Sequence, residues 1–217
     1  MKIGGHRHLR RSIFLAAACL LALVLTACTG RGGGQLPADK VLFKGSASFG
    51  FSFSCEDKGG INPSTGKLAI QLAYTDKGSN PIGASFAIHG TVDTINPVVE
   101  SGACIGQNPP EPDSSALIFL GRYRLVSSAP RGFPTTACPT RETTTSPLCR
   151  FEVTVKDNDK NFAPSPGDFF SIKLSTVTAS CAAPTLEELD PTCTQLPATS
   201  VFYARAGLLS SGNLTVD

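Results

Sequence analysis

Along most of the chain, apolar and polar residues alternate one by one, which is the pattern of a β-strand with one buried face. Between residues 43 and 54, phenylalanine, alanine and glycine occupy every second position, and mostly lysine and serine lie between them. Arg122 and Arg124 fall on the polar side of a later segment, so we expect both to face solvent. We predict further strands in segments separated by Gly-, Pro-, Asn- and Asp-rich turns: 67–75, 82–92, 117–125, 150–156, 170–174, 200–206 and 213–216.

A helical period is not convincing anywhere after residue 28; the best exception is one turn at 185–189, within a loop. Eight or more strands separated by turns predict an all-β fold, an antiparallel β-sandwich or barrel. Loops as long as three of the connections are uncommon in a compact domain and often carry function. These polar, Pro-rich insertions at the rim are residues 97–115, 128–149 and 179–199.

The first residues follow a different pattern, with cations at positions 2, 7, 10 and 11 followed by an apolar run from Ser12 to Leu25. A positively charged start and an apolar run shorter than the ~20 residues of a membrane helix are typical of an export signal peptide. No later stretch approaches ~18 consecutive apolar residues. We therefore predict that residues 1–27 are a signal peptide and that the rest of the chain is exported.

The apolar run ends in Leu25-Thr26-Ala27-Cys28, which resembles, position by position, the lipobox of bacterial lipoproteins. A thiol at the membrane interface accepts a diacylglyceryl group, and small residues before it give the peptidase access to the backbone. The resemblance implies lipidation of Cys28, including palmitate-type chains. At ~0.8 kcal/mol per buried methylene, two or three chains anchor a protein stably. The alternatives are an ordinary secretory signal, with Cys28 incidental, or a rival site at 16–19, which would leave only a short apolar region.

Lipidation predicts a location at a membrane surface, on the cell membrane or the outer membrane. Residue 29 is Thr instead of Asp, which by resemblance to Gram-negative sorting rules implies no retention at the inner membrane. Glycines at 30, 32, 33 and 34 predict that residues 28–39 form a flexible lipidated tether, with a root-mean-square span of roughly 20 Å. Residues 40–217 then form a single β-domain.

The charge balance changes when the signal peptide is removed. Residues 1–27 contain four of the nineteen Lys and Arg residues and none of the seventeen acidic residues, so the remainder has two more anions than cations. Nucleic-acid binding normally needs a basic patch, so we expect no nucleic-acid partner.

Six cysteines remain after Cys19 and Cys28, and an even number in an exported protein predicts disulfides. Six thiols allow fifteen pairings, which the sequence alone does not resolve. Locality favours Cys138–Cys149 and Cys181–Cys193, each closing a polar loop, and Cys55–Cys104 follows by elimination. Each short bridge contributes about 2–3 kcal/mol. Metal binding is the disfavoured alternative, because no CxxC spacing or neighbouring histidine supports it.

Four segments together resemble the post-COAP type domain, a β-domain of exported bacterial proteins. The similarity covers most of residues 43–217 and is strongest in the final hairpins; the cysteine-bracketed loops depart from the family. It implies a secreted β fold and transfers no activity or catalytic residue. The segments that carry it are 43–51, 153–158, 167–172 and 211–216.

One segment has oxygen-bearing side chains at the spacing of a calcium loop: Asp157, Asp159, Asn161 and Asp168 occupy positions 1, 3, 5 and 12. Position 6 is Phe162 instead of the required glycine, two prolines interrupt the loop, and strands flank it. A solvated hairpin turn, which Asp and Asn favour, is the preferred interpretation.

The remaining candidate chemistry is sparse. His89 is the only histidine after the signal, and we interpret it as a surface residue rather than a catalytic base because no GxSxG or HExxH motif accompanies it. The acidic residues at 187, 188 and 190 favour a solvated loop over paired glycosidase carboxylates. Six threonines lie in one loop, at 135, 136, 140 and 143–145, where solvation is the default and glycosylation the alternative.

The sequence therefore favours a non-enzymatic, membrane-anchored envelope protein, a β scaffold that presents stapled loops to an unknown protein or glycan. The second hypothesis is a binding module for a glycan or small ligand, for which a pocket lined by exposed aromatic side chains would be evidence. The third is an enzyme, against which the missing catalytic constellation counts. We expect no cofactor.

Overall fold

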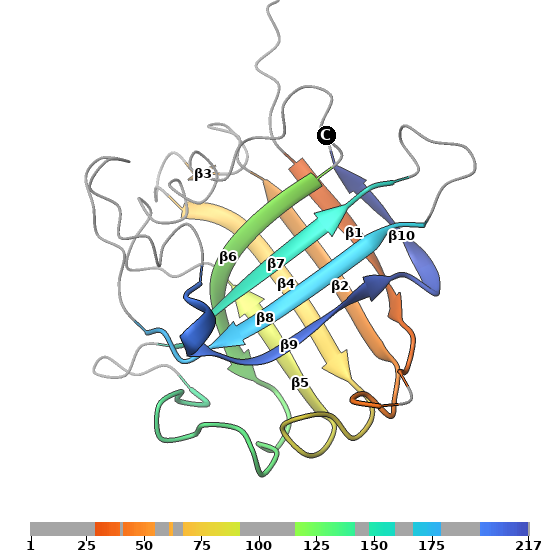
Figure 1. Ribbon diagram of the computed structural model, residues 1–217. Helices are drawn as coiled ribbons and strands as arrows, with labels where there is room; N and C mark the ends of the chain where they lie inside the picture. The colour runs from red at the N-terminus through yellow and green to blue at the C-terminus, as the bar shows by residue number, and fades with distance from the viewer. Residues whose placement is uncertain are drawn as a thin grey trace, which may run out of the picture.

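The protein folds into one antiparallel β-sheet that curls into a half-barrel (Figure 1). The computed structural model describes residues 29–39, 41–54, 61–62, 67–91, 116–141, 148–158, 167–178 and 196–216. Within these residues the strands are β1 (Thr29–Leu36), β2 (Ala47–Ser54), β3 (Ile61–Asn62), β4 (Lys67–Asp76), β5 (Phe86–Thr91), β6 (Ala116–Leu125), β7 (Arg150–Lys156), β8 (Phe169–Ser175), β9 (Val201–Leu208) and β10 (Ser211–Val216), with a short 3₁₀ turn, η3 (Ala198–Ser200).

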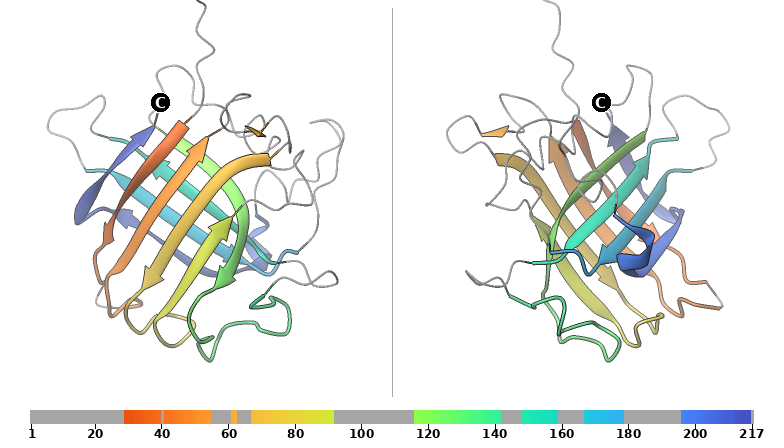
Figure 2. Two further views of the ribbon diagram at one scale, coloured as in Figure 1. Left: turned by 180° about the vertical axis from the view of Figure 1, so that it is seen from behind. Right: turned by 60° about the vertical axis from the view of Figure 1, so that its left-hand side comes forward.

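The strand order of the sheet is β10-β1-β2-β4-β5-β6-β7-β8-β9, and the short strand β3 pairs with β4. From β4 to β9, strands that are consecutive in sequence are neighbours in the sheet, while β10 returns to pair with β1. Figure 2 shows the result from two further sides: β1, β2, β4 and β5 form one layer, and β7, β8 and β9 cross it as a second layer. The all-β, antiparallel prediction is confirmed. None of the described residues forms a helix long and apolar enough to cross a membrane.

Aromatic side chains fill the space between the two layers. Phe49 of β2 stacks on Phe170 of β8 with ring centroids 3.6 Å apart. Phe51 packs against Phe119 of β6 at 5.4 Å. These side chains occupy the inward positions of the alternation, so the predicted buried face is confirmed where the side chains are described. The described interior around these rings is therefore a core packed with aromatic side chains.

The expected flexible tether is instead strand β1, which lies in the sheet between β10 and β2. Its glycines allow close approach of the neighbouring backbones: a Cβ added at Gly34 would lie 2.6 Å from the carbonyl oxygen of Ser211. At Gly32 it would lie 2.5 Å from the carbonyl oxygen of Asn213. The tether prediction is thus wrong for residues 29–36, which belong to the same sheet as the residues after 40, because this glycine run meets a packing requirement.

The outer face of β6 and β7 is also covered, which the alternation did not predict. Leu120 of β6 packs against Leu196 and Val201, so the segment before β9 lies on this face. Arg122, expected to face solvent, is 2 % exposed and donates through Nη1 to the carbonyl oxygen of Leu148 at 2.6 Å. Arg124, two residues later, is exposed as predicted.

The close packing of β1 predicts a specific loss of stability. We expect Gly34→Ala to lower the free energy of unfolding by about 1–3 kcal/mol, because the new methyl group meets fixed backbone atoms. The matched control is Gly50→Ala in β2, where a Cβ would meet its nearest atom at 3.9 Å and stability should be unchanged or slightly higher. Urea denaturation of both variants measures the difference; equal stabilities would contradict the placement of β1 in the sheet.

Candidate functional site

The most concentrated polar group in the described part of the chain lies between the layers, at the end of β4. The Tyr203 hydroxyl on β9 donates to Asp76 Oδ2 at 2.7 Å, and it is hydrogen-bonded to the Tyr74 hydroxyl at 2.5 Å. Arg205 Nη1 forms an ion pair with the same Asp76 oxygen at 3.0 Å. Asp76 is fully buried and Arg205 is 3 % exposed. We call these four residues the Asp76–Arg205 cluster.

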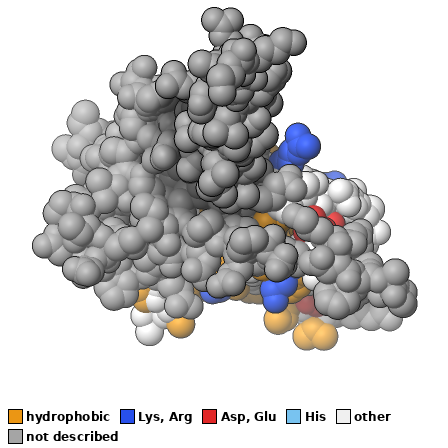
Figure 3. Space-filling view, turned by 90° about the horizontal axis from the view of Figure 1, so that it is seen from above, with side chains coloured by type: hydrophobic (Ala, Val, Ile, Leu, Met, Phe, Trp, Pro, Cys, Tyr) orange, Lys and Arg blue, Asp and Glu red, His pale blue; other side chains and the backbone are white. Residues whose placement is uncertain are grey.

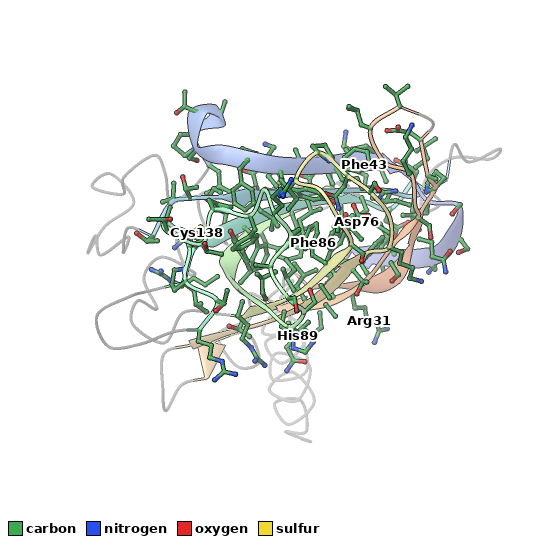
Figure 4. All side chains as sticks on the ribbon, turned by 90° about the horizontal axis from the view of Figure 1, so that it is seen from below. Arg31, Phe43, Asp76, Phe86, His89 and Cys138 are labelled. Carbon is green, nitrogen blue, oxygen red and sulfur yellow. A yellow bond between two sulfur atoms is a disulfide. The ribbon has the colours of Figure 1, made fainter. Side chains whose placement is uncertain are left out.

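Arg205 also reaches the loop that connects β1 and β2. Its Nη2 donates to the carbonyl oxygens of Pro37 at 2.7 Å and Gly45 at 2.8 Å. Its guanidinium lies over the ring of Phe43, 4.5 Å from the centroid. Figure 4, a view from below, labels Phe43 and Asp76, two of the residues that Arg205 contacts. One side chain of β9 therefore holds β4 and the β1–β2 connection together.

That connection is itself held by Asp39. The Oδ1 atom of Asp39 accepts the backbone N–H groups of Val41, Leu42 and Phe43, at 2.7, 2.5 and 3.1 Å. The N–H of Phe43 makes the largest contribution to lowering the pKa of Asp39. The bonded turn places the Phe43 ring over Arg205.

Burial raises the pKa of both tyrosine hydroxyls of the Asp76–Arg205 cluster above the usual range, and also that of Tyr123 on β6. Tyr203 also donates to an acidic side chain, which favours its protonated form further. A tyrosine–aspartate–arginine chain could move protons in an open site. Here every member is buried and bonded to the others, so the arrangement closes this end of the sheet.

Two carboxylates, at the end of β7 and just before β8, bond the edge strand β10 on the side away from β1. Asp168 Oδ2 accepts the N–H of Leu214 at 2.8 Å, and Asp157 Oδ2 accepts that of Val216 at 3.4 Å. Both N–H groups belong to β10. Buried N–H groups need an acceptor, and these carboxylates take the place of a neighbouring strand.

This result bears on the calcium interpretation of the same segment. From the sequence, the preferred interpretation of this segment is a solvated hairpin turn. Asp157 and Asp168 are only 7 % and 4 % exposed, so the solvated turn is wrong for these two residues. Both oxygens of Asp168 already accept backbone N–H groups, the second from Asn158. Asp159 and Asn161 lie outside the described residues. The described part of the chain brings together no group of three or more His, Cys, Asp or Glu suited to a metal.

The predicted disulfide between Cys138 and Cys149 is confirmed, with Cα atoms 5.4 Å apart. It joins the loop after β6 to the start of β7, and both cysteines are fully buried. The Tyr123 hydroxyl packs at the bridge and donates to the carbonyl oxygen of Ser175 at 3.1 Å. The residues of the other two predicted pairs lie outside the described ranges, as do Cys28 and the acidic residues at 187, 188 and 190.

His89 lies on the outer face of the first layer, as predicted, and it is exposed. Figure 4 shows His89 and Arg31 on the side of this layer away from Asp76 and Phe86. Next to His89 is a hollow of about 530 Å³, where small residues on neighbouring strands leave the backbone accessible. The hollow's floor includes Gly50 and Ala73, and its polar side chains are Ser52, Gln71, His89 and Thr91.

The sequence interpretation missed the Asp76–Arg205 cluster, although a signal was present. Asp76 follows Leu72 and Tyr74 at the inward positions of β4, and Arg205 follows Tyr203 at the inward position of β9. A charged residue at an apolar position in two different strands indicates a buried pair.

No family model, curated protein or solved structure matches the chain. The resemblance to the post-COAP type domain therefore stays a prediction.

The buried ion pair predicts a large effect of removing one partner. We expect Arg205→Met to lower the free energy of unfolding by about 3–5 kcal/mol, because it leaves the Asp76 carboxylate buried without its cation. The exposed Arg124→Met, on β6, is the matched control and should change stability by less than about 0.5 kcal/mol. Urea denaturation compares the two variants. Similar small losses would show that Asp76 and Arg205 do not form the pair.

The tyrosines predict how stability depends on alkaline pH. The chain has three tyrosines, Tyr74, Tyr123 and Tyr203, and burial raises the pKa of all three above the ordinary tyrosine value of about 10. Above that pH the unfolded chain loses the protons that the folded chain keeps. The free energy of unfolding should be unaffected below pH 10 and fall above it, by up to ~1.4 kcal/mol per pH unit and tyrosine. Phenolate absorbance should therefore appear only together with unfolding. Phenolate formation in the folded protein near pH 10 would be the contrary result.

Proposed function

We propose that the protein is an exported lipoprotein, anchored to a membrane through Cys28, whose β body acts without catalysis as a scaffold for interactions at the envelope. The anchor rests on the sequence of residues 25–28. The observation that carries the scaffold role is the occupied interior of the sheet. Phe49 and Phe170 stack where a carrier would hold its ligand, and the polar side chains beside them bond to one another. Function then belongs to the outer surface and the connections between strands.

The connection after β6 is the best-supported presenting element of this scaffold. It is tied to β7 by the Cys138–Cys149 bridge, and Phe133 packs its middle against Phe202 of β9 at 5.4 Å. Thr135 and Thr136, next to this anchor, are exposed. A loop fixed at both ends and in its middle loses little entropy when it binds a partner. The partner we propose is a protein or a glycan of the envelope, and no nucleic acid.

The hollow on the outer face favours a second candidate, a module that binds a glycan or another small polar ligand. Ser52, Gln71, His89 and Thr91 offer hydroxyl, amide and imidazole groups around a floor of small residues. The hollow lacks the exposed aromatic side chains that stack on sugars, because Phe51, its aromatic lining residue, is 6 % exposed. We therefore rank this candidate second.

Anchoring is tested by Cys28→Ser in the full-length chain expressed in a bacterium that processes lipoproteins. The variant should fold normally, because Cys28 lies before the first strand, but it should leave the membrane fraction. Membrane fractionation, with mass spectrometry of the mature amino terminus, measures both effects. Release of the variant together with an acylated wild-type terminus is expected; an unacylated wild-type terminus would refute the lipoprotein proposal.

The two binding candidates are separated by crosslinking the lipidated protein in cells and identifying what it captures. The matched variants are Ala73→Phe, which fills the hollow, and Thr135→Arg, which alters the stapled loop. Loss of capture in Thr135→Arg alone supports the scaffold. Loss in Ala73→Phe alone, with polysaccharide as the captured material, would overturn it in favour of the ligand-binding module.

A further inference from the structure

The start of β1 fixes how an acylated chain would meet a lipid surface. Cys28 is joined directly to Thr29, and consecutive Cα atoms are about 3.8 Å apart. Thr29 is already in register with Ser54 of β2. Gly30 is held from both sides, by Phe53 of β2 and Val216 of β10. The chain is therefore already paired in the sheet one residue after the proposed lipidation site.

Two opposite ends of the sheet are defined by this starting point. At the first, which we call the anchor end, β1 and β6 begin and β10 finishes, and the mark for the carboxyl terminus lies there too (Figure 1). At the opposite, distal end are the β1–β2, β4–β5 and β6–β7 connections; Figure 2 shows these at the lower side in both views. The described residues are 37–39 and 41–46 in the β1–β2 connection and 77–85 in the β4–β5 connection. In the β6–β7 connection they are 126–141 and 148–149.

Two described basic side chains lie near the anchor end. Lys156 ends β7 and Arg31 lies near the start of β1, and both are exposed. Asp157 and Asp168, at the same end, are buried and directed to the N–H groups of β10. Ile118, near the start of β6, is an exposed apolar residue. Figure 3 looks onto the molecule from this side; the described groups visible at its margins are basic, acidic and apolar.

We propose that the anchor end faces the membrane and that the distal end, with the loop stapled by Cys138–Cys149, points away from it. This inference rests on the proposed lipidation of Cys28. Acyl chains inserted in the bilayer hold Thr29 at the headgroup level, and a strand paired on both sides transmits that position to the whole sheet. Cations near the surface add attraction to anionic lipids.

Photocrosslinking of the lipidated, full-length protein tests the orientation. Single sites receive a photoreactive amino acid, at the exposed Ile118 near the anchor end or at the exposed Thr135 of the distal loop. The proteins are reconstituted in vesicles of phosphatidylethanolamine and phosphatidylglycerol, irradiated, and analysed for covalently attached lipid. We expect at least tenfold more lipid adducts at position 118 than at position 135.

A variant of the protein with the photoreactive residue at position 118 provides the control for distance from the membrane. Inserting a Gly/Ser linker with a span of roughly 20 Å between Cys28 and Thr29 should let the body move off the surface and reduce the adducts at position 118 severalfold. Equal yields at the two positions, or a higher yield at 135, would overturn the proposed orientation. The mature amino terminus is weighed in the same samples. An unacylated terminus would instead refute the proposed lipoprotein, so the two failures are distinguishable.

Discussion

The folded body depends on side-chain bonds that cross from one layer of the curled sheet to the other. Its two edge strands, β9 and β10, lie at opposite ends of the strand order. Arg205 connects β9 to Asp76 of β4 and to the loop after β1. Asp157 and Asp168 supply the acceptors that β10 would otherwise take from a neighbouring strand. These buried charges hold the curled shape because each has a partner of opposite charge or a backbone group to bond.

The same bonds limit what the interior can do. Phe49, Phe170 and the Asp76–Arg205 cluster fill it, so the available chemistry lies on the outer faces and the connections. The position of β1 also determines how an anchored body would be oriented relative to the membrane. With the first strand paired on both sides from Gly30 onward, an anchor at Cys28 would fix the body at the membrane instead of letting it move freely. The distal connections and the outer faces of the sheet would then remain accessible to a partner.

The sequence predicts the strands whose apolar residues alternate, because burial of one face leaves a period of two in β2, β4 and β8. It does not predict β1, since a glycine run has the same composition in a flexible linker and in a tightly packed strand; only the neighbours at Asn213 and Ser211 distinguish them. The closeness of Cys138 and Cys149 in the sequence, eleven residues apart, was sufficient to predict their disulfide. It could not pair Asp76 with Arg205, because those partners are 129 residues apart and meet only when the sheet curls.

Hydrogen exchange at β10 tests the closure of the sheet most directly. The amides of Leu214 and Val216 face the open edge, where an unpaired strand would exchange rapidly. If these carboxylates bond the edge of β10, both amides should exchange as slowly as those of the interior strand β7, and Asp168→Ala should accelerate exchange of the Leu214 amide before the rest of the sheet. Rapid exchange at both amides in the native protein would contradict the account.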